Sequence, residues 1–391
     1  MAVKAKTQVR SSGKTTGIRK DNQGKTKKMR PHTMDYSIVF LVLFLVGFGL
    51  VMIYSTSSYK GSLYYNDAAY WLKKQAVFAV IGIIAMFFVA RIDYHAWVSK
   101  KWLPWVYYIG TLVLLGFTLI FAAVTHGSKR WISIGPIRFQ PSEIAKVVII
   151  VFLAWYISKY VRKLRNVKGI GIAFLLALPI ICVVAIENLS TSIILLAISV
   201  IMIFVSTDKW WPFFLVGGVG AAIMALFLVT QSYRMDRIYT WLNPAESENG
   251  LQTMQGLYAI GSGGLFGKGL GQSMQKMGFL PETHNDMIFS IICEELGLFG
   301  AICIIGLYFV LLWRFMVVAI NATDLYGSMI AVGAIAHLGI QVFINIGVVT
   351  NTIPNTGIPL PFISYGGTSL CFLLIEMGLV LSVSRFMRVK D

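Results

Sequence analysis

Hydrophobic positions form ten long runs along the chain, and polar or charged segments of very different lengths separate each run from the next. A run of about 20 apolar residues is the length that an α-helix needs to cross a bilayer. We therefore expect spans at 36–56, 72–90, 104–124, 143–161, 169–186, 188–206, 210–230, 287–312, 326–349 and 364–385. The pattern predicts an all-α polytopic membrane protein, a bundle of about ten transmembrane helices.

The polar stretches between and before these runs define the organisation of the chain. Residues 1–35 are rich in Lys, Gly, Thr and Ser and poor in apolar residues, which predicts a disordered basic tail. Residues 36–388 then form one transmembrane domain. Within it, 231–286 is a long loop between the seventh and eighth spans. We expect this loop to be extracytoplasmic, together with the shorter loops 125–142 and 350–363.

The distribution of charge predicts the orientation in the membrane. The chain has 34 Lys and Arg against 17 Asp and Glu, and ten of the basic residues fall in the first 35. With both termini inside, the inner segments hold 23 Lys and Arg and the outer segments hold ten. Cytoplasmic segments carry the excess of Lys and Arg, so we expect a multi-pass protein of the bacterial cytoplasmic membrane with both termini in the cytoplasm. The same rule accounts for the net charge of +17 without nucleic-acid binding.

Composition excludes a soluble protein and gives no sign of a metal site. Apolar residues make up 57% of the chain and charged residues 13%, with a mean hydropathy of +0.71. Soluble domains have about 45–50% apolar residues and about 25% charged residues. The four cysteines and five histidines show no paired spacing, so neither a disulfide framework nor a site built from Cys and His is predicted.

The segment 125–146 brings charge to the start of a span. Pro141 suits the first turn of a helix, and Glu143 and Lys146 follow at a spacing of three on one helix face. One interpretation is a salt bridge that lets the helix end tolerate charge. The other is a substrate cavity, because ionisable groups inside a membrane are costly and usually line a cavity or a path. Neighbouring basic residues such as Arg130 favour the cavity, since clustered cations suit a diphosphate head group.

Residues 255–271 contain seven glycines. Their spacing resembles a nucleotide-binding loop only superficially, because no strand–helix–strand pattern surrounds it and the loop lies on the wrong side of the membrane for ATP or NAD. Tight turns and close backbone packing at the membrane surface explain these glycines better.

The segment before the eighth span carries acidic groups close to the membrane. Asp286 stands at the outer mouth of this span, just after Glu282 and His284. A carboxylate at a partly dry helix mouth has a raised pKa, as a general base requires. A negative charge at a helix N-terminus also stabilises the helix by itself, so the position alone leaves both roles open. Glu294 and Glu295 lie deeper, where buried structural hydrogen bonding explains them better.

Five groups of motifs, in this order, resemble one known family. They are KRWI and FQPSEIAK (129–132, 139–146), YRMDR and WLNP (233–237, 241–244), AIGSGGLFGKGLGQS (259–273), LPETHND and EELG (280–286, 294–297), and PLPFISYGG (359–367). With the ten-span frame they identify the chain as a member of the SEDS family (shape, elongation, division and sporulation), which contains FtsW, RodA and SpoVE. The resemblance covers 34–388, and the start at 35–59 with its basic tail resembles the division type, FtsW, more than RodA.

The resemblance implies a peptidoglycan glycosyltransferase that polymerises lipid II into β-1,4 glycan strands at the outer face of the membrane, for septal wall synthesis in cell division. It places the catalytic aspartate at Asp286 and a Glu/Lys pair of the fourth helix at Glu143 and Lys146. The remaining candidates for substrate binding are Arg130, Glu282, His284 and Ser364. The chain departs from the family where many members read Q-P-D-x-G-T and it reads ENLST (187–191).

The implied partners are lipid II, a monofunctional class B penicillin-binding transpeptidase, other divisome membrane proteins and membrane lipids, with no nucleic acid. No organic cofactor is implied, and a divalent cation, Mg²⁺ or Mn²⁺, at the diphosphate stays open. Three alternatives to an FtsW-type polymerase also stay open: a lipid II flippase, a RodA-type elongation polymerase and a non-catalytic divisome scaffold.

Overall fold

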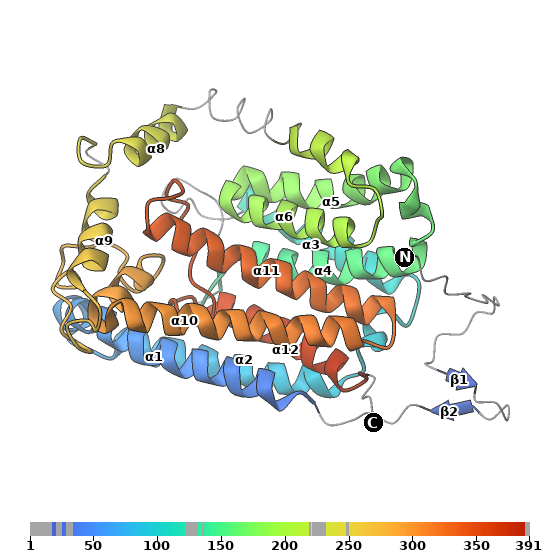
Figure 1. The fold of residues 1–391 in the computed structure, drawn as a ribbon, viewed down its shortest axis with the longest axis horizontal. Coiled ribbons are helices and arrows are strands. Elements are labelled where there is room, and N and C mark those ends of the chain that lie inside the picture. The colour runs from blue at the N-terminus through green and yellow to red at the C-terminus, as the bar shows by residue number, and fades with distance from the viewer. Residues whose placement is uncertain are drawn as a thin grey trace, which may run out of the picture.

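The computed structural model describes residues 18–20, 26–28, 34–121, 131–134, 137–218, 220, 232–247 and 250–387. Its long helices are α1 (Tyr36–Tyr65), α2 (Tyr70–Arg91), α3 (Leu103–Phe121), α4 (Pro141–Tyr160), α5 (Val167–Glu187), α6 (Leu189–Val205), α10 (Ile288–Asn321), α11 (Leu325–Val349) and α12 (Gly367–Ser384). The shorter elements are α8 (Ser232–Leu242), α9 (Leu251–Ser262), the 3₁₀ helices η1 (Tyr94–Val98) and η2 (Lys163–Arg165), and the strands β1 (Ile18–Lys20), β2 (Thr26–Lys28), β3 (Ile132–Ile134) and β4 (Ile137–Phe139). The long helices form a bundle, with α8 and α9 at one end (Figure 1).

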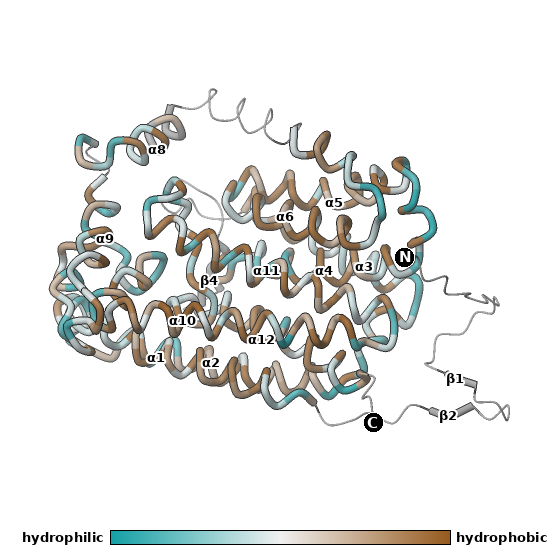
Figure 2. The backbone as a smooth tube through the Cα atoms, in the orientation of Figure 1, coloured by the Kyte–Doolittle hydropathy of each residue, from teal (hydrophilic) through white to brown (hydrophobic). Residues whose placement is uncertain are grey.

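The membrane-spanning character of the bundle follows from the length and composition of its helices. Eight of the described helices are long and apolar enough to cross a membrane, and α6, with 17 residues, is shorter. The expected span at 210–230 lies only partly within the described residues, of which 211–218 are helical. Apolar residues dominate the middle of the helices, and polar residues concentrate towards the two ends of the bundle (Figure 2). The prediction of an all-α polytopic membrane protein is confirmed.

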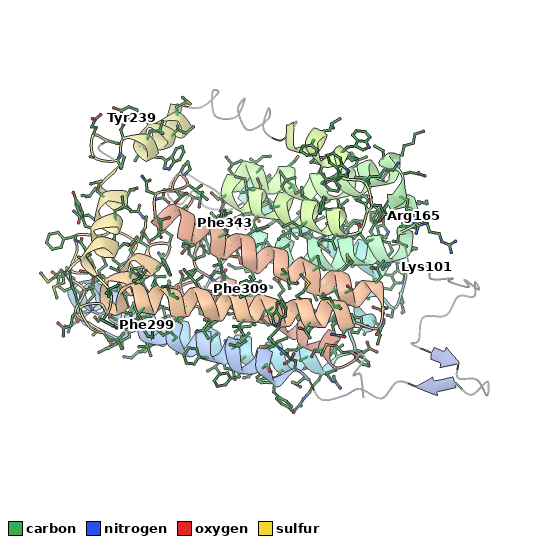
Figure 3. The ribbon with its side chains drawn as sticks, in the orientation of Figure 1. Lys101, Arg165, Tyr239, Phe299, Phe309 and Phe343 are labelled. Atoms are coloured by element: carbon green, nitrogen blue, oxygen red, sulfur yellow. The ribbon has the colours of Figure 1, made fainter. Side chains whose placement is uncertain are left out.

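The start of α1 and the end of α12 lie at the same end of the bundle. The main-chain N–H of Asp35 donates to Oγ of Ser384 at 3.1 Å. Lys101 and Arg165 lie towards this end as well, whereas Tyr239 of α8 lies at the opposite end (Figure 3). The chain therefore crosses the bundle an even number of times, which the ten-span prediction requires.

Three helices form the centre of the bundle. In their most apolar windows, 78% of the residues of α4 and 67% of those of α11 and α12 are buried, against 28% in α2 and α3. α12 packs on α2, and α11 packs on α4, α6 and α10. The outer helices expose large apolar side chains, such as Phe299 and Phe309 of α10, which are 64% and 69% exposed (Figure 3). Polar groups on the three central helices are therefore held away from lipid.

α1 extends to Tyr65, well beyond its expected end at residue 56. Thr56 and Ser57, where the apolar run stops, are fully buried, and both hydroxyls donate back to the carbonyl oxygen of Ile53. Hydroxyl groups that are satisfied within their own helix remain compatible with its interior. The expected end of this span was wrong for that reason.

A short ribbon lies within the segment predicted to be disordered. β1 pairs antiparallel with β2. An isolated two-stranded ribbon is marginal by itself, because it has no face to bury. Asp35, the last residue of the predicted tail, is buried and caps α1 by accepting the N–H of Ser37 at 3.0 Å. Residues 1–17, 21–25 and 29–33 lie outside the described residues.

The glycine-rich segment folds against an interruption in α10. Gly297 has a φ of +70° inside this helix, and Gly267 has a φ of +78°. A Cβ on Gly297 would stand 2.3 Å from the main-chain nitrogen of Gly267, and one on Gly267 would stand 2.2 Å from the carbonyl oxygen of Glu295. Neither position accepts a side chain, which confirms the interpretation of Gly267 as a turn and packing residue.

Gly297→Ala should destabilise the protein by about 1–3 kcal/mol, because it adds backbone strain and a methyl group where backbone already lies. The matched control is Gly306→Ala in the same helix, where nothing lies within 4 Å of the added methyl. That change should be neutral or should stabilise by about 0.5–1 kcal/mol. Thermal unfolding of the purified variants compares them, and equal Tm values would contradict the expected packing.

Candidate active site

Residues 280–287, called the catalytic loop here because they carry the candidate base Asp286, form a compact segment that ends directly before α10. Thr283 is fully buried, and its hydroxyl donates to the carbonyl oxygen of Thr56 in α1 at 3.1 Å. From α11, the Asn345 amide donates to the carbonyl oxygens of Asp286 and Ile358, both at 2.8 Å. Two neighbouring helices therefore fix the catalytic loop, and Asn345 ties it to the segment before α12.

Asp286 is held in the catalytic loop with one carboxylate oxygen unused. The residue is 9% exposed, and its Oδ1 has no hydrogen-bond partner among the described residues. Burial raises the pKa of Asp286 to about 6, and the negative charge of Glu282 acts in the same direction. A carboxylate that is mostly ionised at neutral pH, with a raised pKa and a free oxygen, has the properties of a general base.

His284 stands two residues before Asp286 in an aromatic setting. Its ring centroid lies 4.9 Å from that of Trp71 in α2 and 5.6 Å from that of Tyr365. Burial lowers the pKa of His284 to about 4, so the ring is neutral at neutral pH. Its Nδ1 is buried and has no hydrogen-bond partner within the described part of the chain. The ring therefore keeps hydrogen-bonding capacity two residues before Asp286 in the chain.

The expected ion pair is present near the start of α4. Lys146 Nζ lies 2.9 Å from Glu143 Oε2, and the two side chains are 4% and 10% exposed. Oγ of Ser369 in α12 donates to the same oxygen at 2.7 Å. The pair lines a small cavity of about 20 Å³, together with residues of α11, α12 and the segment 359–366. The two charges therefore belong to an internal polar cavity and not to the lipid-facing surface.

Ser364 connects this cavity with the catalytic loop. It lines the cavity, and its hydroxyl donates to the carbonyl oxygen of Asn285 at 2.6 Å. Gln75 of α2 holds the next turn, because its Oε1 accepts the N–H of Gly366 at 3.1 Å. The segment 359–366 thus contacts the catalytic loop on one side and the polar cavity on the other.

The two remaining candidates are Glu282 and Arg130. Glu282 is exposed, has a φ of +52°, and its carboxylate accepts a hydrogen bond from the amide of Asn285. Its charge influences the pKa of both His284 and Asp286, so it lies close to both. Arg130 lies outside the described residues.

The comparisons with known proteins show the family to which the chain belongs. The model of the cell cycle protein family of FtsW, RodA and SpoVE matches residues 36–389. The chain belongs to this family. Stage V sporulation protein E of Bacillus subtilis (strain 168) is 42% identical over 370 residues, which cover 93% of this chain and 99% of that protein. The probable peptidoglycan glycosyltransferase FtsW of Geobacter sp. (strain M18) is 36% identical over 360 residues, which cover 90% of this chain and 97% of that protein.

Two solved structures are similar to this FtsW/RodA/SpoVE family member over nearly its whole length. One concerns the structural coordination of polymerization and crosslinking by a peptidoglycan synthase complex. It matches with a TM-score of 0.74 and 27% identity, over 90% of this chain and 98% of that chain. The rod shape determining protein RodA of Thermus thermophilus matches with a TM-score of 0.65 and 27% identity, over 91% of this chain and 98% of that chain. The family fold and the multi-pass membrane character predicted from the sequence are confirmed.

The departure from the family motif Q-P-D-x-G-T has a structural consequence between α5 and α6. Asn188 caps α6, because its Oδ1 accepts the N–H of Thr191 at 3.2 Å. Ser190 Oγ donates to the carbonyl oxygen of Thr356 at 2.9 Å. Glu187 is 7% exposed, and neither of its carboxylate oxygens has a partner among the described residues. The segment therefore keeps a capping and packing role in this family member.

A row of polar residues on α11 was missed by sequence analysis. His337, Gln341 and Asn345 follow one another at intervals of four, so they share a helix face. His337 Nδ1 lies 2.7 Å from Oε2 of Glu376 in α12, and both His337 and Gln341 line the polar cavity. The spacing of these three polar residues inside an apolar span could have identified them from the sequence, because polar residues within a span usually face the interior of the bundle.

Glu294 and Glu295 serve the structure, as the sequence predicts. Both are fully buried. Glu294 Oε1 lies 2.8 Å from Lys268 Nζ, and Glu295 Oε1 lies 2.8 Å from Lys276 Nζ. The first pair ties the glycine-rich segment to the start of α10, and the second ties the residues that follow this segment. Neither pair lines the polar cavity.

The described residues do not fit a resident divalent cation. Within the part of the chain that the structure describes, no group of three or more His, Cys, Asp or Glu side chains comes together to hold a metal ion. Mg²⁺ requires about six oxygen ligands in near-ideal octahedral geometry. We therefore derive no step of the reaction through a metal ion.

Proposed function

We propose that the chain is a peptidoglycan glycosyltransferase that polymerises lipid II into β-1,4 glycan strands at the outer face of the cytoplasmic membrane, for septal wall synthesis in cell division. The names of the FtsW relatives support the reaction. The observation that carries the proposal is the Asp286 carboxylate. It is buried in a fixed loop, keeps one oxygen without a partner among the described residues, and adjoins the segment that borders the polar cavity.

Asp286 acts as the general base in this reaction. Its Oδ1 accepts the proton of the C4 hydroxyl of the acceptor sugar, while the hydroxyl oxygen attacks C1 of the donor sugar. The bond between C1 and the diphosphate oxygen breaks, and undecaprenyl diphosphate leaves with the bonding electrons. C1 is inverted and the new bond is β-1,4. Because the diphosphate is a good leaving group, a base and a cationic environment suffice without a covalent intermediate.

Cations complement the negative charge that develops on the departing diphosphate. We assign this role to the ammonium of Lys146, which Glu143 orients at 2.9 Å, and to the guanidinium of Arg130. Glu282 and His284 contact the head groups from the catalytic loop. Ser364 fixes the position of that loop relative to the cavity.

The strands made by this reaction require crosslinking, so we propose a monofunctional class B penicillin-binding transpeptidase as the partner. The similar structure of a peptidoglycan synthase complex supports such an assembly. Other divisome membrane proteins and membrane lipids complete the set of partners.

Purified protein in liposomes, given labelled lipid II with and without the partner transpeptidase, tests the reaction. We expect glycan strands. Movement of lipid II across the bilayer without strands would make the chain a flippase. The absence of both products under conditions where the complex forms would make it a scaffold.

Strand synthesis should depend on pH through Asp286. A general base works in its ionised form, so kcat/KM should fall by about tenfold for each pH unit well below a pKa of about 6 and should level off above it. Glu282→Gln removes a charge that raises this pKa, so the midpoint of the profile should move to lower pH. A profile that does not move would exclude Asp286 as the titrating base.

Both termini are proposed to be cytoplasmic and residues 231–286 extracytoplasmic. Single cysteines at Ser12 and Ser247, in a background without the four natural cysteines, test this with a membrane-impermeant maleimide. Ser247→Cys should be labelled in intact cells, and Ser12→Cys only after permeabilisation. The reverse pattern would overturn the orientation.

A further inference from the structure

Five aromatic rings gather beside the catalytic loop. Trp71 lies at the centre, with its ring centroid 4.9 Å from that of His284, 5.2 Å from that of Tyr65 and 5.3 Å from that of Tyr70. Tyr365 extends the group from the other side of His284, at 5.6 Å. This aromatic platform joins residues of α1, α2, the catalytic loop and the segment 359–366.

The aromatic platform differs from the aromatic residues that face lipid. Trp102, Trp210 and Trp211 are 55%, 65% and 50% exposed, as expected for residues of the membrane interface. Trp71 and Tyr365 are half-buried and contact a histidine of the catalytic loop. The main-chain N–H of Tyr365 also donates to the carbonyl oxygen of that histidine at 2.8 Å. The platform is therefore built onto the loop that carries the proposed base.

Two side chains with hydrogen-bonding groups, Lys74 and His284, accompany these rings. Nζ of Lys74 donates to the hydroxyl of Tyr70 at 2.6 Å and lies 4.3 Å from the centroid of its ring. His284 is 8% exposed, and its Nδ1 has no partner among the described residues. A pyranose ring has the matching chemistry, with C–H groups on its face and hydroxyl groups around its edge. Apolar aromatic surface with a few placed polar groups is typical of a site for such a ligand.

We propose that Trp71, His284 and Tyr365 form a subsite that stacks against the terminal pyranose ring of the acceptor and presents its C4 hydroxyl to Asp286. The inference rests on the proposed function, which supplies the acceptor sugar. Only one residue separates His284 from Asp286, and two helices fix the loop that holds both. The platform and the proposed base are therefore held by the same fixed loop, two residues apart in the chain.

The platform recognises the sugar and not the lipid diphosphate. Comparing the binding of a ligand that has the sugar with one that lacks it therefore distinguishes this subsite from the rest of the site. Binding of lipid II and of undecaprenyl diphosphate is measured on the full-length protein in nanodiscs, with Asp286→Asn in every sample to stop turnover. Trp71→Leu should weaken the binding of lipid II by about tenfold, as expected for the loss of aromatic stacking. Its binding of undecaprenyl diphosphate should change less than about twofold, which also shows that the variant is folded.

Two further variants sharpen the comparison. Trp71→Phe keeps a ring face and should stay close to the parent for both ligands. Tyr365→Leu should reproduce the loss that is specific to the sugar. Trp210→Leu, on the lipid-facing surface, is the matched control and should leave both affinities unchanged.

Unchanged binding of lipid II in Trp71→Leu would overturn the subsite. An equal loss for both ligands would also overturn it, because Trp71 would then support only the fold. The parent protein tests the reaction separately. If wild-type protein makes no strands from lipid II, the proposed function is wrong, while the difference between the two ligands still decides whether the platform binds sugar.

Discussion

Asp286→Asn should remove nearly all strand synthesis and leave the protein folded in the membrane. Asn keeps the shape of the side chain but has no basic oxygen, and loss of a general base lowers the rate by about 10²–10⁴. Burial raises the pKa of Asp286 to about 6, so ionising this carboxyl opposes folding at neutral pH. The neutral amide removes that cost. The Tm of the variant should therefore equal or exceed that of the wild type, while its rate with lipid II collapses.

Asp67→Asn is the matched control at the same end of the bundle. Asp67 Oδ2 lies 2.7 Å from Lys73 Nζ, but the two side chains are 34% and 69% exposed. An exposed pair of this kind contributes little to stability, because solvent screens the two charges. Both the amount of protein and its activity should therefore stay near the wild-type values. Polymerisation by Asp286→Asn at a rate near that of the wild type would remove the general base from the mechanism.

The positions of the helices follow from the sequence because hydrophobic length alone decides whether a segment crosses a bilayer. The expected spans at 326–349 and 143–161 correspond to α11 and α4 almost residue for residue. The end of α1 did not follow, because Ser57 satisfies its hydroxyl within the helix and is then buried by neighbours distant in sequence. Hydropathy counts such a residue as a boundary, whereas packing makes it part of the core.

Some residues of the candidate site can likewise be predicted from the sequence, and others cannot. Asp286 and the pair of Glu143 and Lys146 are visible in the sequence, because charge next to an apolar run is rare and expensive. Trp71 and Gln75 are not, since one aromatic or amide residue at the start of a span has nothing unusual in its sequence context. Their importance appears only when tertiary contacts place them against the catalytic loop and the segment 359–366.

Lys146→Met should lower both the yield and the activity of the protein. The change keeps most of the side-chain volume but leaves Glu143 without its counter-ion in a buried cavity. Removing one partner of such a pair costs roughly 3–5 kcal/mol. The double variant Glu143→Gln/Lys146→Met has no buried charge at either position, so the yield of detergent-extracted protein should recover. Its strand synthesis should remain about 10²-fold low, because the developing charge on the diphosphate has lost its cation.

A second buried ion pair serves as the control that distinguishes a role of Lys146 in catalysis from a purely structural role. Lys276 and Glu295 lie 2.8 Å apart with side chains 4% and 0% exposed, yet neither lines the polar cavity. Lys276→Met should lower the yield as Lys146→Met does, and Lys276→Met/Glu295→Gln should restore both yield and activity. The two double variants therefore differ only in strand synthesis from lipid II. Full activity in Glu143→Gln/Lys146→Met would reduce that pair to helix packing and remove Lys146 from the substrate-binding residues.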